Sequence, residues 1–494
     1  MKEGIIMKKL MTLALAAAMM LGAATGANAI DFKAKGQWIM SFDYGMHGNF
    51  GDSKAATNSG FKRNSNQEDE FEAMQRVRLQ LDAVASEALS GTVFFEIGDQ
   101  VWGNAKSGGA LGADGTVVEL KRAYIDWMVP QTDLKVRMGI QGLALPSFTT
   151  NASQIIDDDV AAVTLNYQFN ENVGLTAFWA RPYNDNNGYK STDAGTKWDN
   201  YMDNMDMFAV LLPLTFDGVK VTPWVMYAAM GPGMFNYDKK PGNAWGRVST
   251  GMVSGFTGTD WNDTYGNAFW AGVTGEVTMW DPFRIAWDVN YGSAAYADEK
   301  MNREGWLASL LLEYKLDWGT PGIFGWYSSG DDGNVKNGSE RMPTMSGCAN
   351  FMSFMGDGNY GWGDPRLYDR NLTYAGTWGV GLRIHDMSFV EDLKHSFRVA
   401  YWGGTNSPAM AKYVKDAYGW DNGTPEGPYL TTNDGLLEFN LVNSYQIYEN
   451  LEANLELSYI VNMVDDDTWK RSYRNDSYKK QDAWKAQLIF AYSF

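Results

Sequence analysis

Few side chains in this 494-residue chain have the spacing that catalysis or metal binding requires. The three histidines, His47, His385 and His395, do not lie at i and i+4 from one another or beside the one cysteine, so no zinc pattern occurs. No G-x-S-x-G or Walker A sequence is present. A Ser–His pair on the outer wall of a barrel would suit a lipase, but neither His385 nor His395 has a distinctive serine motif. We therefore expect no enzyme activity and no cofactor.

Acidic residues occur in short runs that could attract cations. The segment DDGNVKNGSERMP (331–343) begins like a calcium loop, but Lys336 occupies its fifth position and Pro343 stands where the bidentate glutamate belongs. We expect only loose binding of divalent cations by such carboxylates.

Charged residues in the first third of the chain could instead sort solutes. Four arginines lie opposite apolar residues in alternating segments, and an acidic triplet ends the loop 142–159: Arg76, Arg78, Arg122, Arg137, and Asp157, Asp158, Asp159. If the two sets face one another across water, they orient a polar solute and slow an apolar one. The alternatives are a wet interior that tolerates single arginines and a solvated end of the loop.

The elements that must position these charges are β-strands. In the segment 71–83, Phe, Ala, Val and Leu alternate with Glu, Arg, Gln and Asp, and the segments 32–44, 451–461 and 484–494 repeat this rhythm. A helix would mix the two faces within one turn. Mean hydropathy is mildly polar (−0.34) although aromatic residues make up 14% of the chain. This combination is typical of a transmembrane barrel that is apolar outside and wet inside.

The connections between these segments alternate in length, which predicts an all-β, antiparallel, up-and-down barrel with short periplasmic turns and long external loops. We expect about eighteen strands, with sixteen as the alternative if one hairpin is lost. A soluble β-sandwich or propeller is a further alternative, but no blade repeat is visible. The expected strands are 32–44, 71–83, 89–98, 118–129, 134–141, 160–169, 173–180, 206–214, 219–229, 267–279, 283–291, 306–316, 322–328, 374–385, 395–402, 435–446, 451–461 and 484–494.

The N-terminus resembles a secretory signal. Lys8 and Lys9 precede an apolar run, and Ala27-Asn28-Ala29 matches a signal-peptidase site. We expect residues 1–29 to be cleaved and residues 30–494 to form one barrel domain. After residue 29 no apolar run is long enough for a transmembrane helix. The net charge of −18 argues against nucleic-acid binding, which needs a basic face.

The chain ends in AWKAQLIFAYSF, a strand with aromatic residues on one face and a phenylalanine at the last position. A sheet edge in lipid would leave main-chain N–H and C=O groups unpaired at a cost of several kcal/mol each. We therefore expect the last strand, 484–494, to pair with the first, 32–44. Its aromatic residues would then lie at the two headgroup levels.

The cleaved signal, the terminal strand QLIFAYSF, the hairpin LKRAYIDWMVPQTDLKVRMGIQ (120–141) and the alternating loop lengths resemble bacterial outer-membrane porins, and most of all the homotrimeric porins of sulfate-reducing bacteria. The resemblance implies that Phe494 is read by the barrel-assembly machinery and that the third loop folds into the lumen as a constriction. It also implies a homotrimer in the outer membrane of a Gram-negative bacterium, with lipid and lipopolysaccharide as partners, although sixteen strands are usual there.

These observations favour an outer-membrane porin: a water-filled channel for passive diffusion of small hydrophilic solutes and ions, with the third loop facing a basic wall. A substrate-specific channel for a sugar or an organic acid is the alternative, and Phe94, Tyr124 and Phe178 are candidates for an inward aromatic ladder. A secreted surface or adhesin β-protein is the distant alternative.

Overall fold

The structure is a computed structural model. It describes residues 30–46, 70–105, 109–112, 118–150, 152–184, 204–231, 251–254, 265–347, 351–353, 360, 362, 374–414, 417, 428–469 and 480–494. The expected signal peptide, residues 1–29, and His47 lie outside these ranges, so the structure does not test the cleavage site.

The nineteen described strands form one antiparallel sheet. Strands that follow one another in the chain pair, except β8 with β9, and β1 pairs with β19. The strands are β1 (Asp31–Met46), β2 (Glu70–Ser86), β3 (Leu89–Val101), β4 (Val118–Met128), β5 (Leu134–Ala144), β6 (Asp157–Gln168), β7 (Gly174–Asn184), β8 (Asn204–Leu211), β9 (Leu214–Phe216), β10 (Val219–Met230), β11 (Gly266–Val277), β12 (Phe283–Tyr296), β13 (Arg303–Tyr314), β14 (Thr320–Ser328), β15 (Thr377–Val390), β16 (Leu393–Gly404), β17 (Gly435–Tyr448), β18 (Leu451–Asn462) and β19 (Ala483–Ser493).

Two of these strands form a single crossing of the barrel. β8 and β9 both pair with β10, and only Leu212 and Pro213 separate them. Proline has no N–H to donate to the ladder, so the strand is interrupted there without changing direction. The barrel therefore has eighteen strands, and the predicted fold and the higher of the two predicted strand counts are confirmed.

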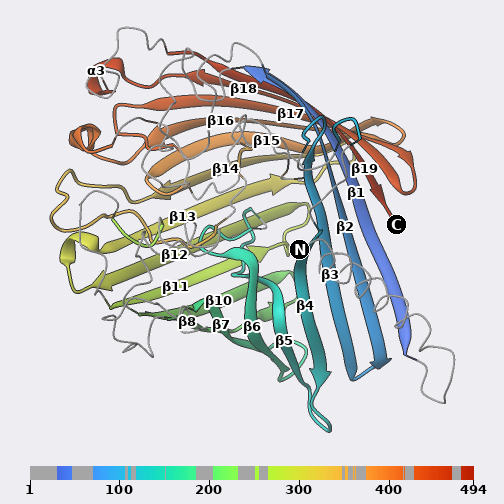
Figure 1. The fold of residues 1–494 in the computed structure, drawn as a ribbon. Coiled ribbons are helices and arrows are strands. Elements are labelled where there is room, and N and C mark those ends of the chain that lie inside the picture. The colour runs from blue at the N-terminus through green and yellow to red at the C-terminus, as the bar shows by residue number, and fades with distance from the viewer. Residues whose placement is uncertain are drawn as a thin grey trace.

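The first and last strands close the barrel as predicted. Their register runs from Gln37 opposite Ser493 to Met46 opposite Trp484, and Figure 1 shows β1 between β2 and the red β19. The pairing reaches the last residue, because Gly36 N donates to Phe494 O (2.7 Å) and Phe494 N donates to Gly36 O (3.0 Å). A Cβ at Gly36 would lie 2.5 Å from Cζ of Phe494, so the glycine makes room for the terminal ring.

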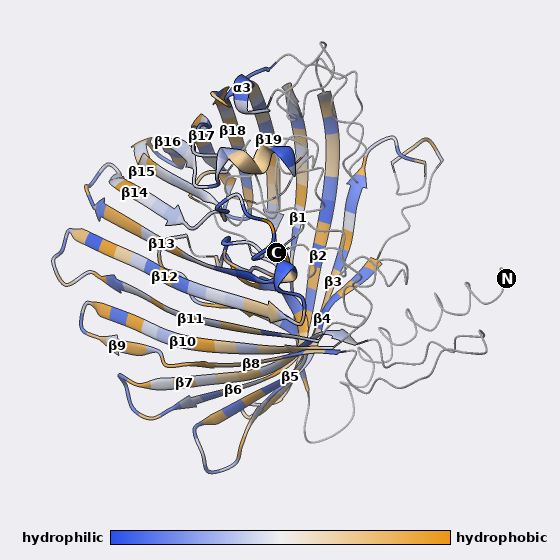
Figure 2. Ribbon diagram, turned by 90° about the vertical axis from the view of Figure 1, so that its left-hand side faces the viewer, coloured by the Kyte–Doolittle hydropathy of each residue, from blue (hydrophilic) through white to orange (hydrophobic). Residues whose placement is uncertain are grey.

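Alternation along the strands separates two faces. In β18, Leu455, Leu457 and Tyr459 are exposed on the outside, whereas Asn454 and Glu456 are buried inside. Figure 2 shows the resulting hydrophobic and hydrophilic bands along the strands. The outward residues suit contact with lipid, as the two-residue period predicts.

The interior is not uniformly polar, which differs from the expectation of a wet lumen. In β8 the outward Phe208 and Val210 are exposed, but the inward Met207, Ala209 and Leu211 are apolar and buried. The buried apolar cluster continues over the inner faces of β10 to β16. The reason is that loops enter the barrel and cover this part of the wall.

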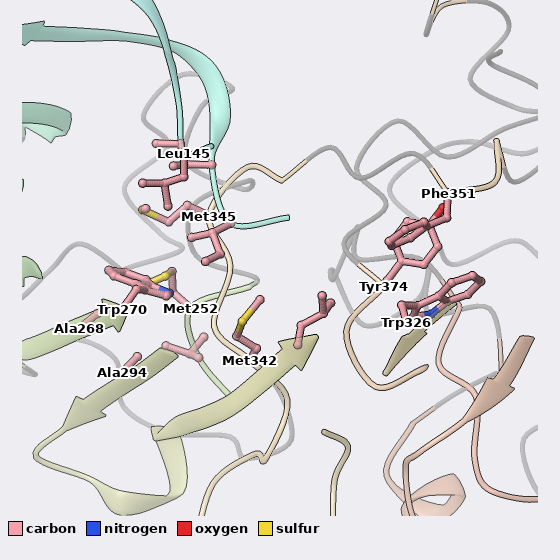
Figure 3. Packing of buried hydrophobic residues seen from close by; sticks show 14 of the residues in the cluster. Leu145, Met252, Ala268, Trp270, Ala294, Trp326, Met342, Met345, Phe351 and Tyr374 are labelled. Atoms are coloured by element: carbon pink, nitrogen blue, oxygen red, sulfur yellow. The ribbon is translucent and has the colours of Figure 1, made fainter. Parts of the chain in front are cut away.

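The loop between β14 and β15 (residues 329–376, called L7) supplies much of this cover. Met342 and Met345 of L7 lie beside Met252 and Trp270 (Figure 3), and the indole of Trp270 donates to Pro343 O (2.9 Å). Further along L7, Phe351 stacks on Trp326 of β14 with ring centroids 5.2 Å apart. These contacts remove apolar surface from water, which stabilises the inserted loop.

The described helices are short: η3 (Glu299–Met301), η4 (Pro408–Lys412) and α3 (Asp466–Trp469). Among the described residues, no helix has the length and hydropathy needed to cross a membrane.

Candidate pore constriction

The loop between β5 and β6 (residues 145–156, called L3) crosses the interior of the barrel to reach β12. Ser147 Oγ donates to Oδ2 of Asp288 (2.7 Å), and the main-chain N–H groups of Phe148 and Thr149 donate to Oδ1 (3.1 Å) and Oδ2 (3.2 Å) of the same carboxylate. Asp288 is 1% exposed, whereas its neighbour Val289 on the outer face is 45% exposed. L3 therefore lies inside the barrel, as the resemblance to porins implied.

More bonds hold L3 along the same wall. Arg284 donates from Nη2 to Phe148 O (2.8 Å), and the hydroxyls of Thr149 and Ser309 are 2.8 Å apart. The other end of L3 joins L7, because Met345 N donates to Ile155 O (2.9 Å). The two loops are thus bonded to one another inside the barrel. L7 also reaches the wall opposite β12, where Trp362 donates to Asp99 (2.7 Å) and lies 5.0 Å from the guanidinium of Arg76.

Arg76 and Arg78 of β2 lie on this opposite wall, facing inward as predicted. Arg76 pairs with Asp99 (2.6 Å) and Arg78 pairs with Glu96 (2.7 Å), both on β3. The carboxylates that neutralise these arginines thus come from the neighbouring strand and not from L3. Sequence reasoning missed both carboxylates. Glu96 lies opposite Arg78 in the ladder, whereas Asp99 lies at a register shift between β2 and β3 that parity does not predict.

Arg137 of β5 is held in a fixed orientation by β4. Its Nε and Nη2 donate to Asp126 (2.7 and 2.8 Å), and its guanidinium lies 4.1 Å from the ring centroid of Tyr124. Lys135 also pairs with Asp126 (3.1 Å). Two cations therefore share one carboxylate, which leaves a net charge of +1 at this point of the wall.

The acidic triplet was predicted to end the loop 142–159, but it forms the first residues of β6, where it pairs with the end of β5, and its members have different partners. Asp159 pairs with Arg122 (2.5 Å) and with Lys121 (2.9 Å). Asp158 instead accepts a hydrogen bond from Ser346 Oγ of L7 (2.7 Å), and Asp157 N donates to Ser346 O (2.7 Å). The structure therefore brings one member of the triplet to one of the four arginines, and it uses the other two to tie β6 to L7.

A second charged cluster lies on β11 to β15. Arg284 pairs with Glu276 (2.8 Å) and Glu313 (2.8 Å), and Arg383 pairs with Glu313 (2.6 Å). Arg398 of β16 lies directly opposite Arg383 in the ladder. These contacts place Arg284 and Arg383 on the inner face of the barrel.

A cavity of about 240 Å³ opens on the inner wall of β5 to β8. Polar and apolar residues both line it, among them Lys135, Arg137, Asn166, Phe178 and Leu211. The cavity therefore combines a net positive charge with an apolar side.

The aromatic residues Phe94, Tyr124 and Phe178, which were candidates for an inward ladder, do not form a continuous surface on which a sugar could stack. Phe94 lies under Arg122, with 5.6 Å from the guanidinium carbon to the ring centroid, and Tyr124 lies under Arg137. Only Phe178 lines the cavity. The first two rings orient arginines, because a cation is attracted to the face of an aromatic ring.

The described residues contain no group of three His, Cys, Asp or Glu side chains placed to hold a metal ion. In the calcium-like segment, Asp331 accepts hydrogen bonds from Ser339 and from the hydroxyl of Tyr429. Burial, together with the Asp331 carboxylate, raises the pKa of Tyr429 well above its ordinary value, so this phenol stays a donor. His395 contacts Asn443 (2.7 Å) through Nδ1.

Comparisons with known proteins identify the fold. No protein-family model matches the sequence, and no curated protein matches it significantly. Solved structures do match: a BenF-like porin from Pseudomonas fluorescens Pf-5 (TM-score 0.51, 10% identity, 94% of this chain and 98% of that chain), OpdQ of Pseudomonas aeruginosa (0.50, 12%, 95% and 99%), and OccAB2 of Acinetobacter baumannii (0.50, 10%, 95% and 99%).

At these identities the likeness concerns the fold alone, and it lends no support to a particular closeness to the porins of sulfate-reducing bacteria. It agrees with the closed eighteen-strand barrel. The chain has the fold of bacterial outer-membrane porins.

Proposed function

We propose that this protein is a passive outer-membrane channel for small hydrophilic solutes and ions, with a preference for anions at its narrow part. The observation that carries the proposal is the closed barrel in which L3 is bonded to Asp288 on β12, with a cavity on the inner wall of β5 to β8 beside the ion pair of Arg137 and Asp126. No step in this function requires catalysis.

The anion preference follows from the charge count around the cavity. Lys135 and Arg137 contribute two positive charges and Asp126 one negative charge. A small anion that passes the cavity replaces part of its hydration shell with donors from these side chains. Arg76, Arg78, Arg122, Arg137 and the triplet Asp157, Asp158 and Asp159 remain our candidates for the constriction, with Asp159 as the acidic member that lies at an arginine.

Recordings in planar bilayers test this function. We expect ohmic single-channel conductance and a reversal potential on the anion side in a KCl gradient. Arg137→Gln should shift the reversal potential toward cations. Arg181→Gln is the matched control, since Arg181 is also paired with a carboxylate, Asp206 (2.9 Å), but lies beside the outward Trp179 and does not line the cavity. Absence of channels, or no shift for Arg137→Gln, would refute the proposal.

A substrate-specific channel is the second candidate, and the mixed polar and apolar lining of the cavity favours it. A specific channel saturates, so one solute should block ion current at low concentration. A small organic acid would engage Lys135 with its carboxylate and Phe178 with its apolar part, whereas a sugar lacks the charge. If no organic acid or sugar changes the ion current, the substrate-specific channel is excluded and the general diffusion channel is supported.

The assembly proposed from the sequence belongs to the same hypothesis. Export after cleavage of residues 1–29, recognition of Phe494 by the barrel-assembly machinery, and a homotrimer like that of the porins of sulfate-reducing bacteria are expectations of the resemblance. The intact mass of the mature chain and native mass in detergent would test the first and the last.

A further inference from the structure

The tip of L3, residues 147–149, directs several donors at one carboxylate of the barrel wall. Ser147 Oγ, Phe148 N and Thr149 N donate to Asp288 at 2.7, 3.1 and 3.2 Å, and the hydroxyl of Thr149 donates to it as well. Asp288 lies in β12, and its neighbours in the sheet add the hydroxyls of Thr274 and Ser309 (3.4 Å to the latter). One buried side chain is therefore the common acceptor of the loop and the wall.

The arrangement requires both oxygens of a carboxylate. Phe148 N donates to Oδ1 and Thr149 N donates to Oδ2, and a main-chain N–H cannot change from donor to acceptor. An asparagine at this position would present its NH₂ group to one of the two N–H groups. Hydrogen bonds to a charged acceptor are also about twice as strong as neutral ones.

We propose that Asp288 is a positioning residue that holds the tip of L3 against β12 and thereby sets the width of the channel. This inference depends on the proposed channel function. It concerns the tip alone, because the end of L3 is tied separately to L7 by Met345 N–Ile155 O (2.9 Å) and Asp157 N–Ser346 O (2.7 Å). Without the carboxylate the tip keeps the bond from Arg284 Nη2 to Phe148 O (2.8 Å) but loses its bonds through Ser147 and Thr149, so the tip should become more mobile while the barrel and the base of L3 remain.

Single-channel recording of Asp288→Asn tests the role. We expect a higher mean conductance and more open-state noise than in the wild type. Asp43→Asn is the control, because Asp43 is an equally buried inward carboxylate on β1 and accepts from Ser41 Oγ (2.5 Å). The control removes the same charge from the interior and should leave the noise unchanged.

A disulfide between L3 and the barrel wall should restore wild-type conductance to Asp288→Asn if the residue acts by positioning the loop. It should not do so if Asp288 only stabilises the fold. Thr149 Oγ1 and Ser309 Oγ are 2.8 Å apart, so cysteines at these two positions can be joined. In a Cys348→Ser background, the variant with Asp288→Asn, Thr149→Cys and Ser309→Cys should have quiet, wild-type conductance when oxidised. After reduction it should return to the noisy, higher conductance.

If Asp288→Asn does not fold, Ser147→Ala with Thr149→Val removes the hydroxyl donors from the loop side without altering a strand, and the same rise in conductance is expected. Wild-type conductance and noise in the folded variants, or a disulfide that does not restore quiet conductance, would overturn the role of Asp288. A wild-type protein that forms no channels at all would instead refute the proposed function.

Discussion

Replacing Asp126 by asparagine should make the channel more selective for anions. Asp126 accepts two hydrogen bonds from Arg137 and pairs with Lys135 beside the cavity. The substitution removes one negative charge and raises the local net charge from +1 to +2, while the stacking of Arg137 on Tyr124 (4.1 Å) keeps the guanidinium in place.

The size of the effect follows from Coulomb's law. For an ion about 6 Å from the removed charge in a water-filled lumen, the electrostatic energy of the ion changes by about 0.7 kcal/mol. Screening at 0.1 M salt reduces it to about 0.4 kcal/mol, because the Debye length is about 10 Å. Permeability should therefore rise about twofold for an anion and fall about twofold for a cation. The ratio of anion to cation permeability should then rise about fourfold.

The assay is the reversal potential in a KCl gradient across a planar bilayer. Asp206→Asn is the matched control, because Asp206 binds Arg181 through the same two-pronged contact (2.9 and 2.9 Å) and also accepts from Trp179, which is exposed on the outer face. The control should not change selectivity. A shift toward cations, or an equal shift in both variants, would refute the placement of Asp126 beside the ion path.

Three further predictions concern stability. Deletion of Phe494 removes both main-chain hydrogen bonds to Gly36 and a half-buried ring, so we expect the free energy of unfolding to fall by about 2–4 kcal/mol. Gel electrophoresis should show a lower temperature of barrel unfolding, and an unchanged temperature would contradict the closure of the barrel by β1 and β19. Trp326→Ala should cost about 3–5 kcal/mol, because the ring is packed against Phe351, and limited proteolysis of L7 should become faster; equal cleavage rates would show that the stack does not hold the loop. Glu313→Gln leaves Arg284 and Arg383 without the carboxylate that they share, and it should lower the urea midpoint of unfolding by an amount equivalent to about 3 kcal/mol. Wild-type stability of this variant would mean that water solvates both arginines.

Much of the fold could be predicted because a barrel repeats one local rule. The two-residue period placed Leu455 and Leu457 on the outer face and Asn454 and Glu456 on the inner face, and the structure agrees. The period failed to describe the inner face of β8, where Met207 and Leu211 are apolar. Both faces of β8 are apolar, because lipid contacts the outer face and an inserted loop, not water, covers the inner face.

The candidate site was predicted in part. The inward direction of Arg76, Arg78 and Arg137 follows from parity alone. Their partners Glu96, Asp99 and Asp126 depend on the register between adjacent strands, which a single sequence specifies less firmly.

The sequence by itself determined the closed barrel and the side of the wall on which Arg76, Arg78 and Arg137 lie, because these follow from local alternation and from the cost of an unpaired edge in lipid. It left sixteen and eighteen strands open. The tertiary structure alone decided which carboxylate meets which arginine and where L3 ends. Ser147 and Asp288 are separated by 141 positions in the chain. No local pattern encodes such a contact, because it depends on the curvature of the whole sheet and on the path of a loop through its interior.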